Sequence, residues 1–291
     1  MKKKLKRSFS VFLAGICLIF SCTVTYAQEK DLNVLNKKTE KMITEIEEQY
    51  GINRSYFDDI VEMYFDNGYT DCKELNIAIQ DAAKQMMVIC EKTEAEYQDA
   101  FVKYQANISD YNNTTYSINP VYSTAMNLYR TGISIVQNAN CPETARSMEH
   151  AIVPESAVGT GWTPGRLHYD DVSWSKFLIT TQEFWQKMEG QFQYQLGLGK
   201  DVITFSGSHA FTQANSSLDA YVQLHNVNYS VTFVKKPGGS GYTGNVLISD
   251  IYDFDWTNYD NFVIGFANNY CKAVQDAGFI APYPIYVSGK L

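Results

Sequence analysis

The spacing of apolar and polar residues changes along this chain from a helical period to a strand period. From Asp31 to about Asn140, apolar residues recur every three or four positions, which is typical of amphipathic helices. From Asp201 onwards the period changes to two, which is typical of half-buried strands. The order of the two patterns predicts helices first and a sheet second.

Local signals divide the first region into four helices. The first ends at Gly51, the second runs from about Ser55 to Gly68, the third begins near Cys72, and the fourth begins at Pro120. Their apolar stripes are typical of a bundle core. In the fourth helix we expect four residues to face that core: Val121, Ala125, Leu128 and Val136.

The second region is predicted to hold strands and one late helix. A capping-box pattern at Thr180 starts a helix that ends at Gly197 or Gly199, and a strand follows from Asp201. Residues 221–234 form a second extended run whose apolar face switches parity near His225, which a β-bulge or a corner would explain. The remaining elements are a turn at 236–241, a strand at 245–254, a helix at about 259–277 capped by Gly278, and an edge-like segment at 281–287.

These elements predict an α+β fold, in which an N-terminal helical bundle is followed by an antiparallel β-meander with a packed C-terminal helix. We expect four parts along the sequence. They are a signal peptide at 1–27, a helical region at 28–157, a loop plus helix linker at 158–200, and an antiparallel β-rich C-terminal domain at 201–291.

The first 27 residues have the three parts of a secretory signal peptide. Basic residues precede an apolar run from Val11 to Phe20, and Thr25 and Ala27 are the small residues that a signal peptidase reads. The mature chain should therefore start at Gln28 and be secreted, without an integral membrane segment. The alternative is lipidation at Cys22, although Phe20 is bulky where such a site has a small residue.

The charge of the chain limits its partners. The net charge is −8, and the leader carries five basic residues and no acidic ones, so its removal leaves a value near −13. An acidic surface of this kind repels phosphate backbones and anionic headgroups, so we expect no nucleic-acid partner.

Four cysteines remain after the leader: Cys72, Cys90, Cys141 and Cys271. If Cys72 and Cys90 lie on one helix, they are about 27 Å apart at 1.5 Å per residue, which is beyond disulfide reach. Any disulfide should therefore join Cys72 or Cys90 to Cys141 or Cys271. The alternative is four free or buried thiols.

The candidate site is the acidic end of the strand at 245–254. Alternation places Asp250 on the apolar face with Ile248 and Tyr252, and places Asp253 and Asp255 on the other face. A buried carboxylate is costly unless it is paired, hydrogen-bonded or protonated, so Asp250 is expected to have a shifted pKa. His209, on the apolar face of another strand, is a conceivable partner. In the alternative, Asp250 accepts backbone hydrogen bonds, and the other two acids are solvated.

The run Ser249-Asp-Ile-Tyr-Asp-Phe-Asp255, followed by a helix and by Gly278-Phe-Ile-Ala-Pro-Tyr-Pro-Ile285, resembles C-terminal regions of secreted bacterial polymorphic toxins of the Rhs kind. Its core is similar to the Asp-x-Tyr-Asp signature of the colicin M family. That family hydrolyses the undecaprenyl-pyrophosphate linkage of lipid II, with magnesium, at the outer face of the cytoplasmic membrane. The resemblance implies catalytic roles for Asp250, Tyr252 and Asp253. Where the family continues with a His-Arg pair, this chain has Tyr259-Asp260.

Two hypotheses for the function follow. In the first, the chain is an antibacterial toxin that acts on a lipid-linked envelope precursor, with Asp253 and Asp255 as ligands of Mg²⁺ or Ca²⁺. In the second, it is a non-enzymatic secreted protein that binds a glycan or a protein. An enzyme needs several acids that converge on one site, whereas a binding module does not.

Overall fold

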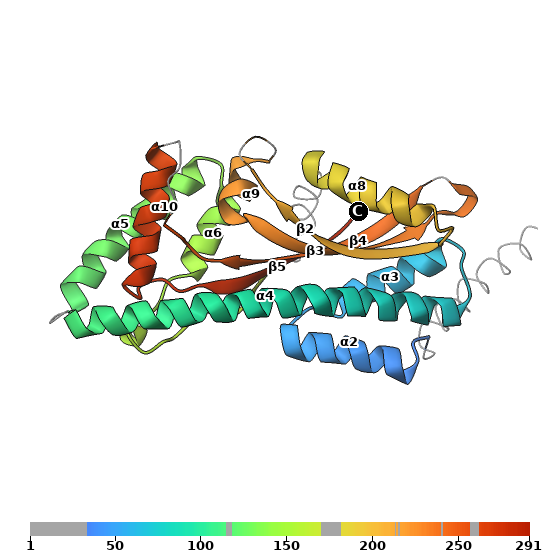
Figure 1. The fold of residues 1–291 in the computed structure, drawn as a ribbon, viewed down its shortest axis with the longest axis horizontal. Coiled ribbons are helices and arrows are strands. Elements are labelled where there is room, and N and C mark those ends of the chain that lie inside the picture. The colour runs from blue at the N-terminus through green and yellow to red at the C-terminus, as the bar shows by residue number, and fades with distance from the viewer. Residues whose placement is uncertain are drawn as a thin grey trace, which may run out of the picture.

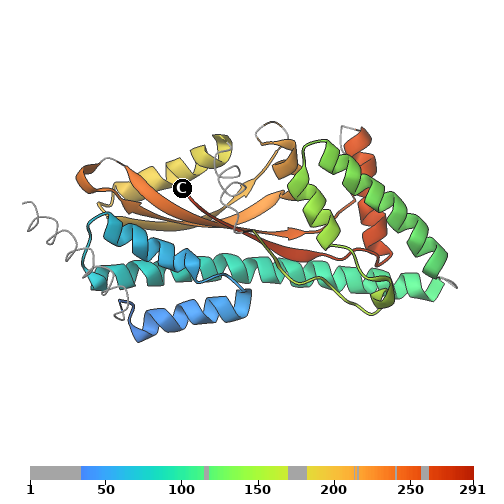
Figure 2. The ribbon, with the colours of Figure 1, turned by 180° about the vertical axis from the view of Figure 1, so that it is seen from behind.

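The computed structural model describes residues 34–114, 118–169, 182–212, 214, 216–239, 241–256 and 262–291. The predicted leader, the Gln28 start and the alternative site at Cys22 lie outside these residues. In the described part, helices cover both faces of a twisted sheet (Figures 1 and 2). The α+β class predicted from the pattern is confirmed.

The N-terminal half is helical, as expected. Its helices are α2 (Lys37–Tyr50), α3 (Ser55–Asp66), α4 (Cys72–Thr114), α5 (Ile118–Asn138) and α6 (Pro142–His150), followed by the 3-10 turn η1 (Glu155–Ala157). Gly51 ends α2 in the left-handed conformation, with φ 71°, and its N–H donates to Glu47 O at 2.9 Å. This is the glycine cap that the sequence predicted.

The C-terminal half holds the sheet. Its elements are β1 (Leu167–Tyr169), α8 (Gln182–Leu196), β2 (Val202–Ala210), α9 (Leu218–Gln223), β3 (Asn226–Lys235), η2 (Pro237–Gly239), β4 (Tyr242–Tyr252), α10 (Phe262–Asp276) and β5 (Tyr283–Lys290). The strand order is β1-β5-β4-β3-β2. All pairings are antiparallel except β1 with β5, which is parallel.

Two sequence-based expectations for this half were wrong. The segment at 281–287 was expected at an edge, but β5 lies inside the sheet because β1, only three residues long, pairs with its outer side. The run at 221–234 was expected to be extended throughout, but its first part belongs to α9. Ser217 caps that helix by accepting the N–H of Ala220 at 3.1 Å. The switch in parity is therefore a helix-to-strand junction rather than a bulge.

Each face of the sheet packs against its own set of helices. On one face α2, α3 and α4 form a core that includes Val234, Leu247 and Tyr286. On the opposite face α5, α6, α8, α9 and α10 contribute to a second core that includes Val231 and Ile248. Because both faces are covered, β3 and β4 are buried along most of their length.

The face of α5 that packs into the core, against α6 and α10, differs from the one expected. Val121 and Leu128 are 44% and 53% exposed instead of buried, and Ala125 and Val136 are half-buried. The residues that fill the core are larger: Tyr122, Met126, Tyr129 and Ile133. The two stripes interleave along the helix, and the one with more surface to bury faces inward.

The four described cysteines form no disulfide. Cys72 is exposed, and Cys90, Cys141 and Cys271 are buried. All four are free thiols, so no disulfide joins Cys72 or Cys90 to Cys141 or Cys271. Burial raises the pKa of Cys90 and of Cys271 to about 12. The expectation that Cys72 and Cys90 lie on one continuous helix is confirmed by α4.

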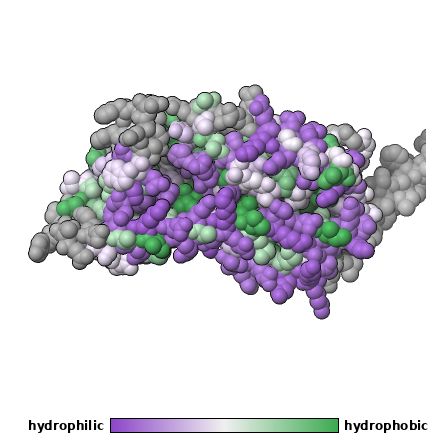
Figure 3. Space-filling view, viewed as in Figure 1, coloured by the Kyte–Doolittle hydropathy of each residue, from purple (hydrophilic) through white to green (hydrophobic). Residues whose placement is uncertain are grey.

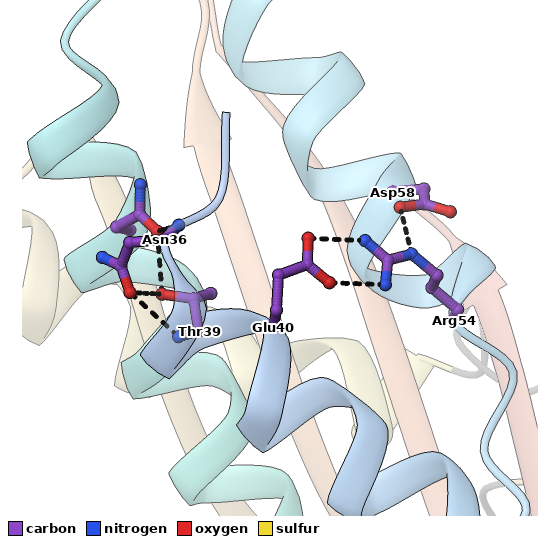
Figure 4. Close-up of polar contacts among 6 residues, drawn as sticks. Asn36, Thr39, Glu40, Arg54 and Asp58 are labelled. Carbon is purple, nitrogen blue, oxygen red and sulfur yellow. Dashed lines mark hydrogen bonds and ion pairs between the residues drawn. The ribbon is translucent and has the colours of Figure 1, made fainter. Parts of the chain in front are cut away.

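The start of the described chain is fixed to α3 and α4 by polar contacts (Figure 4). Arg54 forms a two-point ion pair with Glu40, at 2.7 and 2.9 Å, and also contacts Asp58 at 3.3 Å. Asn76 of α4 accepts the Asn36 N–H and the Thr39 hydroxyl, both at 2.8 Å. These contacts hold α2 in place without a disulfide.

The surface seen in Figure 3 is largely hydrophilic, with apolar residues scattered over it. Within the described residues, no helix combines the length and the apolar character that crossing a membrane requires.

Candidate functional site at the end of strand β4

Asp250 lies on the sheet face predicted from the alternation and is 8% exposed. Its Oδ1 accepts the N–H of Ile251 at 2.9 Å, and its Oδ2 accepts the N–H of His225 at 3.1 Å. The carboxyl group therefore ties the end of β4 to the junction between α9 and β3. This is the arrangement expected of a structural acceptor.

The electrostatics of Asp250 follow from this burial. Loss of hydration raises the pKa of its carboxyl group well above the usual value, the two amides oppose that shift, and the negative charge of Asp253 adds to it. His209, proposed as a partner, is on β2, and β3 separates that strand from β4. Its ring packs against Phe184 and Phe211, with centroids 5.3 and 4.8 Å away.

Tyr252 is part of the core. It is 4% exposed, and its ring centroid is 5.3 Å from those of both Phe254 and Tyr283. Burial raises the pKa of its phenol well above the usual value, so the hydroxyl stays protonated at neutral pH. The structure thus places Asp250 and Tyr252 on the buried side of the strand end.

Asp253 differs because it lies just beyond the strand and its side chain is exposed. The surrounding groups still remove enough hydration to raise its pKa to about 6, and the negative charge of Asp255 adds to the shift. The positive charges of Lys272 and Lys103 act in the opposite direction. Near neutral pH this carboxyl group can therefore both accept and release a proton.

The two lysines come from elements far apart in the sequence. Lys103 is exposed on α4, whereas Lys272 is buried on α10. Lys272 pairs with Asp276 at 2.7 Å, and Asn107 of α4 donates to the same carboxylate oxygen at 2.6 Å. The spacing of Lys272 and Asp276 is a signal for an ion pair on a helix. No local pattern connects these residues to Asp253, so the sequence analysis missed them.

Hydrogen bonds from both helices fix the end of β4. Gln275 of α10 accepts the Phe254 N–H at 3.2 Å, and Thr93 of α4 donates to Ser249 at 2.9 Å. Lys92 donates to Asn228 of β3 at 2.7 Å. These hydrogen bonds hold the end of β4, and with it the exposed Asp253, against α4 and α10.

The two predicted metal ligands, Asp253 and Asp255, lie at the end of β4. Asp255 is exposed, and its carbonyl oxygen accepts a hydrogen bond from Asn268 at 2.7 Å. Within the residues that the structure describes, no three His, Cys, Asp or Glu side chains are grouped so that they could hold a metal ion. Ca²⁺ takes six to eight oxygen ligands, more than Asp253 and Asp255 provide, whereas Mg²⁺ is commonly held by one or two carboxylates together with water and substrate phosphates. The metal site stays a prediction, and the chemistry proposed below does not use it.

Comparisons with known proteins gave one distant likeness. No family model matches this chain, and no curated protein matches it. Part of the structure aligns distantly with the solved structure of PaeM, a colicin M-like bacteriocin produced by Pseudomonas aeruginosa, with a TM-score of 0.33 and 12% sequence identity. The match covers 75% of this chain and 87% of that chain. At this level of similarity, the neighbour carries no argument about the activity of this chain.

Proposed function

We propose that this chain is a secreted, toxin-like hydrolase that acts in the bacterial envelope, with Asp253 as its acid–base group. The observation that carries the proposal is the state of that carboxyl group. It is exposed, its pKa is raised to about 6, and two lysines act on it electrostatically. A general acid–base group works best when its pKa is close to the working pH.

The lysines indicate the charge of the substrate. Hydrolysis of a phosphate ester or anhydride needs positive charge near the oxygens that become more negative in the transition state. Lys272 is buried and already paired with Asp276. The exposed Lys103 is therefore the positive charge near Asp253 that a substrate can reach, and the Tyr259-Asp260 pair of this chain adds none. We therefore take the substrate to be an anionic, lipid-linked envelope precursor, which is the class implied by the resemblance of the motif.

The proposal divides the three motif residues between two roles. Asp253 accepts or releases the proton, whereas Asp250 and Tyr252 hold the end of β4 in place from the buried side. This division is supported by the two backbone amides bound to Asp250 and by the burial of Tyr252.

The test is viability of bacteria that direct the protein either to the periplasm or to the cytoplasm. We expect the wild-type protein to reduce viability only in the periplasm, and Asp253→Asn to abolish that effect without lowering the melting temperature. Asp66→Asn, which changes an exposed carboxylate at the end of α3, is the matched control and should remain toxic. A folded Asp253→Asn protein as toxic as the wild type would show that Asp253 does no chemistry.

A second candidate function is recognition of a glycan or a protein without catalysis. Trp256 directly follows the acidic segment and is 62% exposed, and Trp162 is 37% exposed. Exposed indole rings can stack on sugars. If this function is correct, Trp256→Ala should weaken glycan binding, measured by tryptophan fluorescence, while Asp253→Asn should leave it unchanged.

A further inference from the structure

Helix α5 carries a line of exposed apolar side chains. Val121, Leu128 and Ile135 are 44%, 53% and 63% exposed, and successive members are seven residues apart. Both ribbon views place α5 at one end of the molecule, beside α10 (Figures 1 and 2). The opposite side of α5 already packs into the core.

The residues between these three complete a heptad pattern. Thr124, Thr131 and Asn138 are also exposed, and each follows an apolar residue of the line by three positions. Alternating steps of three and four residues define the seam along which one helix packs on another. We call these six residues the α5 seam.

The charge of α5 indicates what can approach the seam. The helix contains no Asp or Glu, and Arg130 is its one charged residue, in a chain whose net charge is −8. Two copies of an acidic chain repel each other over most of their surfaces. Two α5 helices that face each other add no carboxylates to the interface, so a second copy of this chain can approach the seam without the repulsion that acidic surfaces cause.

We propose that the α5 seam is a self-association surface on which α5 of a second copy packs in parallel. Two-fold symmetry then places each seam residue against its own counterpart, so that three apolar layers form from Val121, Leu128 and Ile135. An antiparallel pair would set these side chains against Thr or Asn. The parallel arrangement therefore buries more apolar surface against apolar surface.

The size of the seam limits the strength of the dimer. Stable complexes bury about 800 Å² on each partner, which is more than six side chains of one helix provide. We therefore expect a reversible dimer whose population rises with protein concentration.

Analytical ultracentrifugation of the purified protein over a wide concentration range tests the proposal. The mass of the wild type should rise towards twice that of the monomer. Leu128→Glu and Ile135→Glu should each weaken association at least tenfold, without a change in melting temperature. Val88→Glu is the matched control, because Val88 is 56% exposed on α4, outside the seam, and it should associate like the wild type.

A cysteine at position 121 tests the orientation. In a Cys72→Ser background, which removes the exposed native thiol, a parallel pair brings two Val121→Cys side chains together, and a mild oxidant should link them. In an antiparallel pair these positions lie at opposite ends of the interface. A wild type that stays monomeric at every concentration, an equal effect of Val88→Glu and Leu128→Glu, or a dimer without the Val121→Cys link would each overturn the proposal.

Discussion

Replacing Asp250 by Asn should destabilise the protein, because the two oxygens of this carboxyl group serve two different backbone amides. Asparagine offers one acceptor oxygen and one NH₂ group that donates. Whichever way the amide turns, either the Ile251 N–H or the His225 N–H loses its acceptor. Asp250 is 8% exposed, so water does not readily replace the lost partner.

A buried N–H without an acceptor costs about 1–3 kcal/mol of folding free energy. For a chain of this size, 1 kcal/mol corresponds to roughly 2–4 °C in melting temperature, so Asp250→Asn should melt about 2–12 °C below the wild type. Differential scanning calorimetry at neutral pH measures this difference. The control Asp66→Asn removes an exposed carboxylate and should change stability by less than about 0.5 kcal/mol.

The result also separates a structural role of Asp250 from a catalytic one. If Asp250→Asn has the same melting temperature as the wild type, the hydrogen bonds to the two backbone amides do not stabilise the fold, and the structural role is wrong. If it also loses periplasmic toxicity at an unchanged melting temperature, Asp250 takes part in the chemistry. A destabilised variant that remains toxic below its melting temperature supports the division of roles proposed above.

Four further predictions concern packing and pH. Asn76→Leu should lower the free energy of unfolding by about 2–3 kcal/mol in a denaturant titration, because it removes the hydrogen bonds that hold α2 on α4. Gly244→Ala should cost about 1–3 kcal/mol, since a Cβ there would lie 2.6 Å from a ring carbon of Phe233. Gly190→Ala, at an exposed position of α8 where a Cβ meets nothing within 4 Å, should instead stabilise by about 0.5–1 kcal/mol. Because the pKa of Asp253 is raised from 3.8 to about 6, its contribution to stability is present below pH 4 and is lost as the pH rises to 6. The stability of Asp253→Asn, measured by thermal melts from pH 4 to 7, should therefore fall less than that of the wild type.

Local chemistry made much of the fold predictable. Gly51 was identifiable as a cap because glycine adopts a positive φ without strain, and the observed φ is 71°. The face on which Asp250 lies followed from the two-residue period of β4, because alternate side chains point to the same face. Both features depend on residues close together in the sequence.

Features that depend on distant residues were missed. The three residues of β1 have no period long enough to detect, and they form a strand because β5 offers them a free edge. In α5 both stripes have helical spacing, and only the packing against α6 and α10 decides that Tyr129 rather than Leu128 is buried. The lysines near Asp253 approach it only when α4 and α10 pack beside β4.

The end of β4 explains how one short acidic motif can contain two different carboxyl groups. Asp250 and Asp253 are three residues apart, and the strand ends between them at Tyr252. Asp250 still lies within the paired strand and becomes buried, whereas Asp253 follows its last paired residue and keeps contact with water. Substituting Asn at the two positions should therefore have different effects on the melting temperature. At Asp250 the change removes an acceptor of a buried backbone N–H and should lower the melting temperature. At Asp253 it removes a negative charge that has lost part of its hydration and should not lower the melting temperature. A comparison of the two variants in one melting experiment tests whether the sheet, rather than the motif alone, determines what each carboxyl group does.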